Sequence, residues 1–268
     1  MTPTNCLLAL ALCGTVPALH AGTLLTFPTG NFSYSEDFSN FGQQGNFVCA
    51  ASKNGVCAAA SEINSLIFLE NQYPGIYGNK LTPGSKGSKP NQTDPTDTLA
   101  FANLYYKSPK GAYSAFVDAE TQWFNKYAPG TTYLESNYPG SAEYNGVPTL
   151  NFLATQIQQQ EDVELFIYGG GIGHAIDLTA ITCTAAGCVI KYQDPNSPKV
   201  QQTSQLFNGP GGSLIFQGLP GTSPKYTQTF FTISAAFGES PVPEPSSWIL
   251  FGTGIAGLVF IRKVCANR

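Results

Sequence analysis

The chain has 268 residues, of which only 11% are charged, and its formal net charge is −4. Thirteen Lys and Arg residues, without a basic cluster in the central part of the chain, argue against a nucleic-acid-binding role. The 28 Gly, 19 Pro and 12% aromatic residues indicate a globular body with long loops rather than a disordered chain.

The N-terminal segment has the features of a signal peptide. An apolar run extends from Cys6 to Val16, and small residues follow at Ala18 and Ala21. We expect residues 1–21 to be removed on export, although no Lys or Arg precedes the apolar run. The following segment, 22–240, is long enough for one domain with its own core.

Apolar residues at helical spacing predict helices in the first half of this domain. The first helix is expected to begin at Val56 or Cys57, directly after Gly55, and to end before Pro74. Further helices are expected over residues 98–106 and 113–127 and from Leu150 to Ile157, with turns over 129–146.

Runs rich in β-branched and aromatic residues predict strands in the second half. These runs are residues 163–168, 175–182, 189–193, 213–216 and 226–233. Helices first and an antiparallel sheet second predict an α+β fold.

The end of the chain combines three features in series. They are the motif Val242, Pro243, Glu244 and Pro245, the apolar run Trp248–Ile261, and the basic pair Arg262 and Lys263. The apolar run reaches about 21 Å as a helix, against roughly 30 Å for a hydrocarbon core. Flanking serines and snorkelling of the basic pair make a thin membrane span feasible.

This order and spacing resemble the PEP-CTERM sorting signal of bacterial envelope proteins. The resemblance implies that residues 241–268 are a sorting and anchor segment recognised by an exosortase-type enzyme, which removes the tail. It further implies export across the inner membrane, association with the membrane through the C-terminal segment, and delivery to the cell envelope, cell surface or extracellular matrix.

Four cysteines remain in the central domain. Cys183 and Cys188 flank a short turn, so they are expected to be neighbours in a hairpin and to form a disulfide in an oxidising compartment. Cys49 and Cys57 remain open to two interpretations. Either they form a second disulfide, or one of them is a reactive thiol.

Three residues form a candidate catalytic set. Cys57 is expected at a helix start, where backbone N–H groups and the helix dipole favour the thiolate. His174 lies at the entry to a predicted strand, and Asp194 at the end of the strand after the hairpin. If those strands pair, the imidazole and the carboxylate lie at the same end of the ladder. The carboxylate could then orient the imidazole, which could deprotonate the thiol.

The segments GVCAAASEINSLIFL and TLNFLATQIQQQEDVELFIYGGGIGHAIDLTAITCTAAGCVIKYQDPNSP resemble the papain-like cysteine peptidases in the broad sense. The resemblance implies a papain-like α+β fold, with N-terminal helices packed on a C-terminal antiparallel sheet. It implies Cys57 as nucleophile, His174 as general base and Asp194 as the orienting acid, with Asn196 in reserve for the last role.

Two further roles stay open in this resemblance. A side-chain donor for an oxyanion hole is expected upstream of the nucleophile, and Gln43, Gln44 and Asn54 are the candidates. Gln43 precedes Cys49 by a spacing that the family often shows, so Cys49 remains a reserve nucleophile.

These features predict an exported, envelope-anchored thiol hydrolase that cleaves peptide bonds in a peptide or protein substrate. We expect no cofactor and no metal site, because a lone His without a Cys pair or acidic ligands nearby is a poor zinc pattern. Two alternatives remain: a non-catalytic surface or matrix protein on the same scaffold, and acyl transfer or amide hydrolysis on cell-wall or polysaccharide-linked peptides.

Overall fold

The computed structural model describes residues 31–40, 56–85, 96–197, 200–220 and 224–242, which belong to one compact unit, Leu24–Val242. The α-helices of this part are α2 (Cys57–Gln72), α3 (Thr96–Lys107), α4 (Ala112–Tyr127) and α5 (Leu150–Gln158). Its strands are β1 (Phe32–Ser35), β2 (Thr132–Tyr138), β3 (Tyr144–Asn145), β4 (Asp162–Gly169), β5 (Ile172–Thr184), β6 (Gly187–Gln193), β7 (Gln201–Asn208), β8 (Leu214–Gln217) and β9 (Phe230–Pro241).

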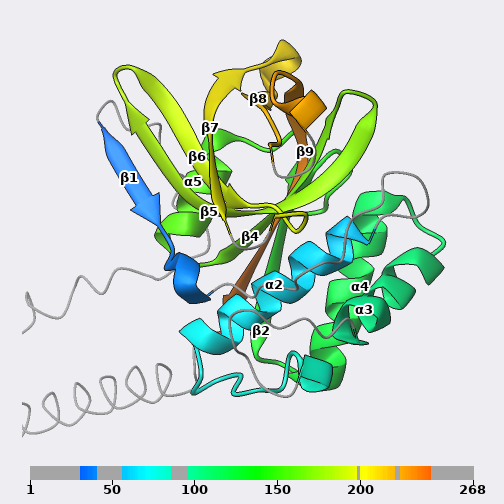
Figure 1. Ribbon diagram of the computed structural model, residues 1–268. Helices are drawn as coiled ribbons and strands as arrows, with labels where there is room; N and C mark the ends of the chain where they lie inside the picture. The colour runs from blue at the N-terminus through cyan, green and yellow to red at the C-terminus, as the bar shows by residue number, and fades with distance from the viewer. Residues whose placement is uncertain (1–30, 41–55, 86–95, 198–199, 221–223, 243–268) are drawn as a thin grey trace, which may run out of the picture. The chain divides into compact units, whose positions relative to one another are not determined.

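Six strands close into an antiparallel barrel (Figure 1). Strands β5, β6, β7, β8 and β9 pair in that order, and β4 pairs with both β5 and β9. Because β4 joins the two ends of the series, the barrel leaves no unpaired edge along this ladder. The long strands β5 and β9 also pair outside the barrel, β5 with β1 and β9 with β2, and the short β3 follows β2 in parallel.

The barrel contradicts the predicted papain-like arrangement of N-terminal helices on a C-terminal antiparallel sheet, and that fold prediction is wrong. The decisive contact is the pairing of Leu165 in β4 with Ala236 in β9. The last strand was expected to end at Ile233, but it continues to Pro241 and returns to β4. Pairing between segments so far apart in the chain leaves no local pattern from which closure can be inferred.

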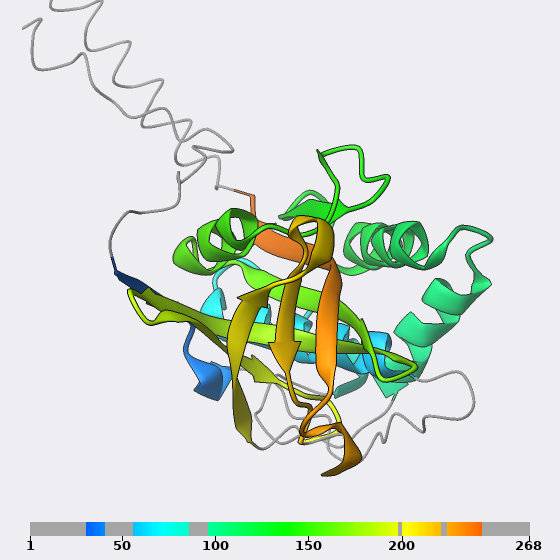
Figure 2. The same ribbon diagram turned by 90° about the horizontal axis from the view of Figure 1, so that it is seen from above.

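Three helices lie together on one side of the barrel. Helix α2 packs on β5 and β4, α3 packs on α2, and α4 packs on α3, as Figures 1 and 2 show from two directions. Helix α2 is buried from Cys57 to Glu70, and its first turn is made of small residues, Ala58, Ala59 and Ala60. Small side chains let this end of the helix approach the strands closely.

The sheet separates two apolar cores because side chains alternate along each strand. Val163, Leu165 and Ile167 of β4 belong to the barrel interior. Phe166, on the opposite face, packs among the helices, with ring centroids 4.8 Å from Phe116 of α4 and 5.1 Å from Phe237 of β9. Alternation therefore puts Glu164 and Phe166 of β4 on the face that the helices cover.

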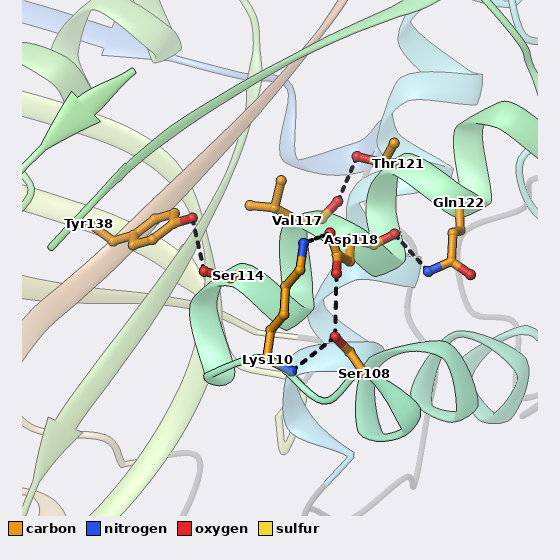
Figure 3. Close-up of polar contacts among 8 residues, drawn as sticks. All are labelled: Ser108, Lys110, Ser114, Val117, Asp118, Thr121, Gln122 and Tyr138. Atoms are coloured by element: carbon orange, nitrogen blue, oxygen red, sulfur yellow. Dashed lines mark hydrogen bonds and ion pairs between the residues drawn. The ribbon is translucent and has the colours of Figure 1, made fainter. Parts of the chain in front are cut away.

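The junction of α3 and α4 is held by exposed polar contacts (Figure 3). Lys110 Nζ lies 2.8 Å from Asp118 Oδ1, and the Ser108 hydroxyl lies 3.4 Å from the other oxygen of Asp118. The Ser114 hydroxyl lies 3.4 Å from the hydroxyl of Tyr138 at the end of β2. The first two contacts lie near the surface, whereas the third reaches Tyr138, a member of the core between the helices and the sheet.

The predicted helices agree with the observed ones to within a few residues, and α2 begins at Cys57. The predicted strands at 163–168, 175–182, 189–193 and 213–216 correspond to β4, β5, β6 and β8. Strand β2 was expected to be turns, and β7 was not expected at all. The sequence of β7, QQTSQLFN, is mostly polar because much of it faces solvent, so its strand pattern is weak.

Candidate functional site

The β5–β6 hairpin fixes the relative positions of His174 and Asp194. Its register pairs Thr184 with Gly187 at the turn and Cys183 with Cys188 beside it, and the predicted Cys183–Cys188 disulfide is confirmed. At the other end Asp177 pairs with Gln193. The entry to β5 and the segment after β6 therefore meet at the end of the ladder opposite the disulfide.

His174 and Asp194 are in direct contact at that end. His174 Nε2 lies 2.9 Å from Asp194 Oδ1, and the side chains are only 2% and 0% exposed. The backbone N–H of Asn196 donates to the same carboxylate oxygen at 2.8 Å, and Asn196 Nδ2 lies 3.5 Å from His174 Nε2. A carboxylate only accepts hydrogen bonds, so donation from Nε2 makes Nδ1 the basic nitrogen of the neutral ring.

Cys57 is the first residue of α2 and is 6% exposed. No side chain caps the helix at Val56, so the N–H groups of the first turn and the helix dipole can stabilise a negative charge there. Cys57 is disulfide-bonded in this structure. Its sulfur is therefore held in oxidised form, and only reduction would free a thiol at this position.

The orientation of α2 directs Cys57 toward the His174 end of β5. Just after the first turn of the helix, the Ser61 hydroxyl donates to Asp177 of β5. The far end of α2 bonds to Asn40, through Asn71 and Gln72. Directly after α2, the Tyr73 hydroxyl donates to the carbonyl of Gln160, just before β4, and the antiparallel register of β4 and β5 puts that end of β4 beside the part of β5 beyond Asp177.

Helix α2 and strand β5 therefore lie side by side, and these contacts fix the direction of the helix relative to the strand. Moving back along α2 from Ser61 to Cys57 corresponds to moving back along β5 from Asp177 toward His174. Cys57 and Ala175, the residue next to His174, also belong to the same apolar cluster.

Several predicted residues lie outside the described residues. They are the oxyanion candidates Gln43, Gln44 and Asn54, the reserve nucleophile Cys49, the signal segment 1–21 and the motif residues Pro243, Glu244 and Pro245. Val242, the first residue of the motif, is described, and its N–H donates to the carbonyl of Thr131 at 2.7 Å.

Sequence reasoning missed the contact between Ser61 and Asp177, which ties the helix of the candidate nucleophile to the strand of the candidate base. A signal was present, since Asp177 is the one charged residue in the mostly apolar segment AIDLTAI. A buried Asp in such a strand requires a partner, although the sequence does not identify which residue provides it.

A second polar centre was also missed. Glu62 of α2, Glu120 of α4, Glu164 of β4 and Glu239 of β9 are all buried, and each can place one carboxylate oxygen within 4.8 Å of the others'. We predicted no metal site, because the lone His lacks a Cys pair or acidic ligands nearby. The four glutamates are scattered along the chain and form no ligand motif. Only the packing of α2 and α4 on the sheet brings them together.

The comparison with protein families identifies the C-terminal end of the chain. The family model of the PEP-CTERM protein-sorting motif matches residues 241–263. No family match supports the papain-like interpretation of the central domain, and no curated protein matches the chain. In the described part of the chain, no helix has both the length and the apolar character needed to cross a membrane. The sorting motif indicates that this protein is exported and anchored at the cell envelope or surface, and that an exosortase-type enzyme recognises it.

Proposed function

We propose that this exported protein is a thiol hydrolase that cleaves peptide bonds, with Cys57 as nucleophile, His174 as general base and Asp194 as the orienting acid. The observation that carries the proposal is the buried contact between His174 and Asp194 at 2.9 Å. Such a pair holds the imidazole in one tautomer and stabilises the imidazolium formed when the ring accepts a proton.

The direction of α2 supports Cys57 as the third member. His174 would take the proton of the thiol, and the sulfur would attack the peptide carbonyl carbon. The C–N bond would then break, with the proton passing from His174 to the leaving amine. Water, deprotonated by the same ring, would hydrolyse the thioester and restore the thiol.

The disulfide at Cys57 adds a condition to this proposal. The oxidised sulfur cannot attack a carbonyl, so the hydrolase is inactive until a reductant releases the thiol. The protein would therefore be exported in a latent form.

The test is a comparison of oxidised and reduced full-length protein on a mixed peptide substrate library. We expect cleavage only after mild reduction, and loss of that cleavage in the Cys57→Ala variant. The matched control is the double variant Cys183→Ser/Cys188→Ser, which removes the disulfide at the opposite end of the hairpin and should keep the reduced activity. Equal cleavage by reduced wild type and by Cys57→Ala would refute the proposal.

A second readout tests the link between Cys57 and His174. Iodoacetamide should label reduced Cys57 near pH 7 faster than an ordinary thiol, because the neighbouring ring and the helix start favour the thiolate. In His174→Gln the labelling rate at that pH should fall by about tenfold or more. An unchanged rate would mean that the ring does not act on the sulfur.

The disulfide also favours a second candidate, a non-catalytic surface or matrix protein. In that case the cysteine stabilises the start of α2 and has no chemical role. This candidate predicts that reduction lowers the thermal stability of the protein without revealing any cleavage of the peptide library.

A further inference from the structure

A cluster of four glutamates lies between the helices and the barrel. Glu62 is 0% exposed, as are Glu164 and Glu239, and Glu120 is 1% exposed. They come from two helices, α2 and α4, and two adjacent strands, β4 and β9. In the part of the chain that the structure describes, no ion pair with Lys, Arg or His reaches any of the four.

Glu164 supplies an observation beyond the clustering itself. Its side chain lies on the helix-facing side of β4, directed into the cluster, and neither carboxylate oxygen has a hydrogen-bond partner. An unpaired carboxylate in a dry interior costs several kcal/mol. By contrast, the carboxylate of Glu70, at the other end of α2, is also buried, but it accepts hydrogen bonds from the backbone of Leu81 and Thr82 and from the Thr82 hydroxyl. Glu164 lacks such donors.

The charged groups that act on the cluster from its surroundings are acidic. Burial raises the pKa of Glu62, Glu164 and Glu239 well above the usual value, and raises that of Glu120 to about 8. The charges of Asp162 and Asp177 act in the same direction on Glu62 and Glu164. A positive charge inside the cluster would reverse each of these penalties.

We propose that Glu62, Glu120, Glu164 and Glu239 bind one calcium ion. Calcium takes six to eight oxygen ligands at about 2.3–2.6 Å, so ligands on opposite sides of the ion are about 4.6–5.2 Å apart. Each of the four carboxylates offers one oxygen, and these oxygens all lie within 4.8 Å of one another. This distance falls within the range expected for ligands around one calcium ion. Four carboxylates, each able to coordinate through one or two oxygens, also supply enough donors without water.

Calcium fits better than magnesium for two reasons. Magnesium requires ligands at about 2.0–2.1 Å and retains several of its waters, whereas the cluster is closed to solvent. One calcium ion balances two of the four negative charges.

The cluster is closed to solvent, so an ion can enter it only when the protein opens locally. The metal is therefore supplied while the protein refolds. The full-length protein, with its disulfides intact, is unfolded in guanidinium with EDTA and refolded in about 10 mM CaCl2, in about 10 mM MgCl2 or in EDTA. After desalting, we expect about one calcium per chain by atomic emission. With an affinity on the order of 10⁻⁴ M, the Tm in CaCl2 should exceed that in EDTA by about 5–10 °C.

The variants Glu164→Gln and Glu239→Gln keep the side-chain shape and remove one charge each. Both should lose the retained calcium and the rise in Tm. Asp118→Asn, which removes an exposed carboxylate at the α3–α4 junction, is the matched control and should behave as wild type (Figure 3). The proposal is overturned if refolded wild type retains no calcium, if both cluster variants retain as much as Asp118→Asn, or if magnesium gives the same retention and rise in Tm.

Discussion

Asp194 and Glu164 are both fully buried carboxylates, and the difference between them is the source of the compensating charge. Asp194 contacts His174 at 2.9 Å and accepts the N–H of Asn196. Glu164 faces three other glutamates and has no hydrogen-bond donor within the described residues. Burial of a carboxylate is thus tolerated in two ways in one molecule. In the first the chain itself provides the partner, and in the second a proton or a cation must provide it.

The largest effect is expected from breaking the first centre. His174→Leu leaves the Asp194 carboxylate buried beside an apolar side chain, and removing one partner of a buried pair costs about 3–5 kcal/mol. The free energy of unfolding from urea titrations at neutral pH should fall by this amount. The double variant His174→Leu/Asp194→Leu should recover part of the loss, because it no longer buries an unpaired charge. A double variant as unstable as the sum of both single variants would show that the two residues do not compensate each other.

The second centre should respond in the opposite direction. In EDTA, Glu164→Gln should raise the free energy of unfolding by about 2–3 kcal/mol at a pH of about 8, toward the upper end of the cost of a buried polar group without a partner. The wild-type cluster must either bury another charge or hold a proton on a carboxyl group that has no hydrogen-bond donor. The amide of Gln also brings N–H donors that the cluster lacks. Asp118→Asn, measured in parallel, should change stability by less than about 1 kcal/mol, because its ion pair with Lys110 is exposed. Destabilisation by Glu164→Gln in EDTA would contradict this interpretation of the cluster.

The sequence predicted most of the elements because their patterns are local. The small and apolar residues after Gly55 indicate α2, and the turn between Cys183 and Cys188 indicates the hairpin and its disulfide. The barrel could not be predicted in this way. Its closure depends on β9 pairing with β4, and a strand gives no sign of which distant partner it will meet.

The same distinction explains the two buried centres. His174 and Asp194 could be related through one hairpin, because strand register converts sequence spacing into spatial position. The four glutamates come from elements joined only by tertiary packing, so nothing in their spacing links them. Each of them also sits in an otherwise ordinary helix or strand. Their common signal is a charged residue on a buried face, which is visible only when the faces are known.

The smallest of the three effects concerns Glu161, at the edge of the acidic region and only 6% exposed. Burial, assisted by the charge of Glu135, raises the pKa of Glu161 from 4.5 to about 7. A raised pKa in the folded state means that the folded protein holds its proton more tightly than the unfolded chain does. The favourable contribution is complete below the unfolded pKa, near 4.5, and is lost as the pH rises through about 7.

Glu161→Gln removes this titration and leaves the rest of the acidic region in place. Between pH values of about 4.5 and 8, the free energy of unfolding of wild type should therefore fall by about 1–2 kcal/mol more than that of Glu161→Gln. Chemical denaturation of both proteins in EDTA across this range measures the difference directly. Because the glutamate cluster is present in both, its own titration cancels in the comparison. Parallel pH profiles would mean that Glu161 ionises normally in the folded protein.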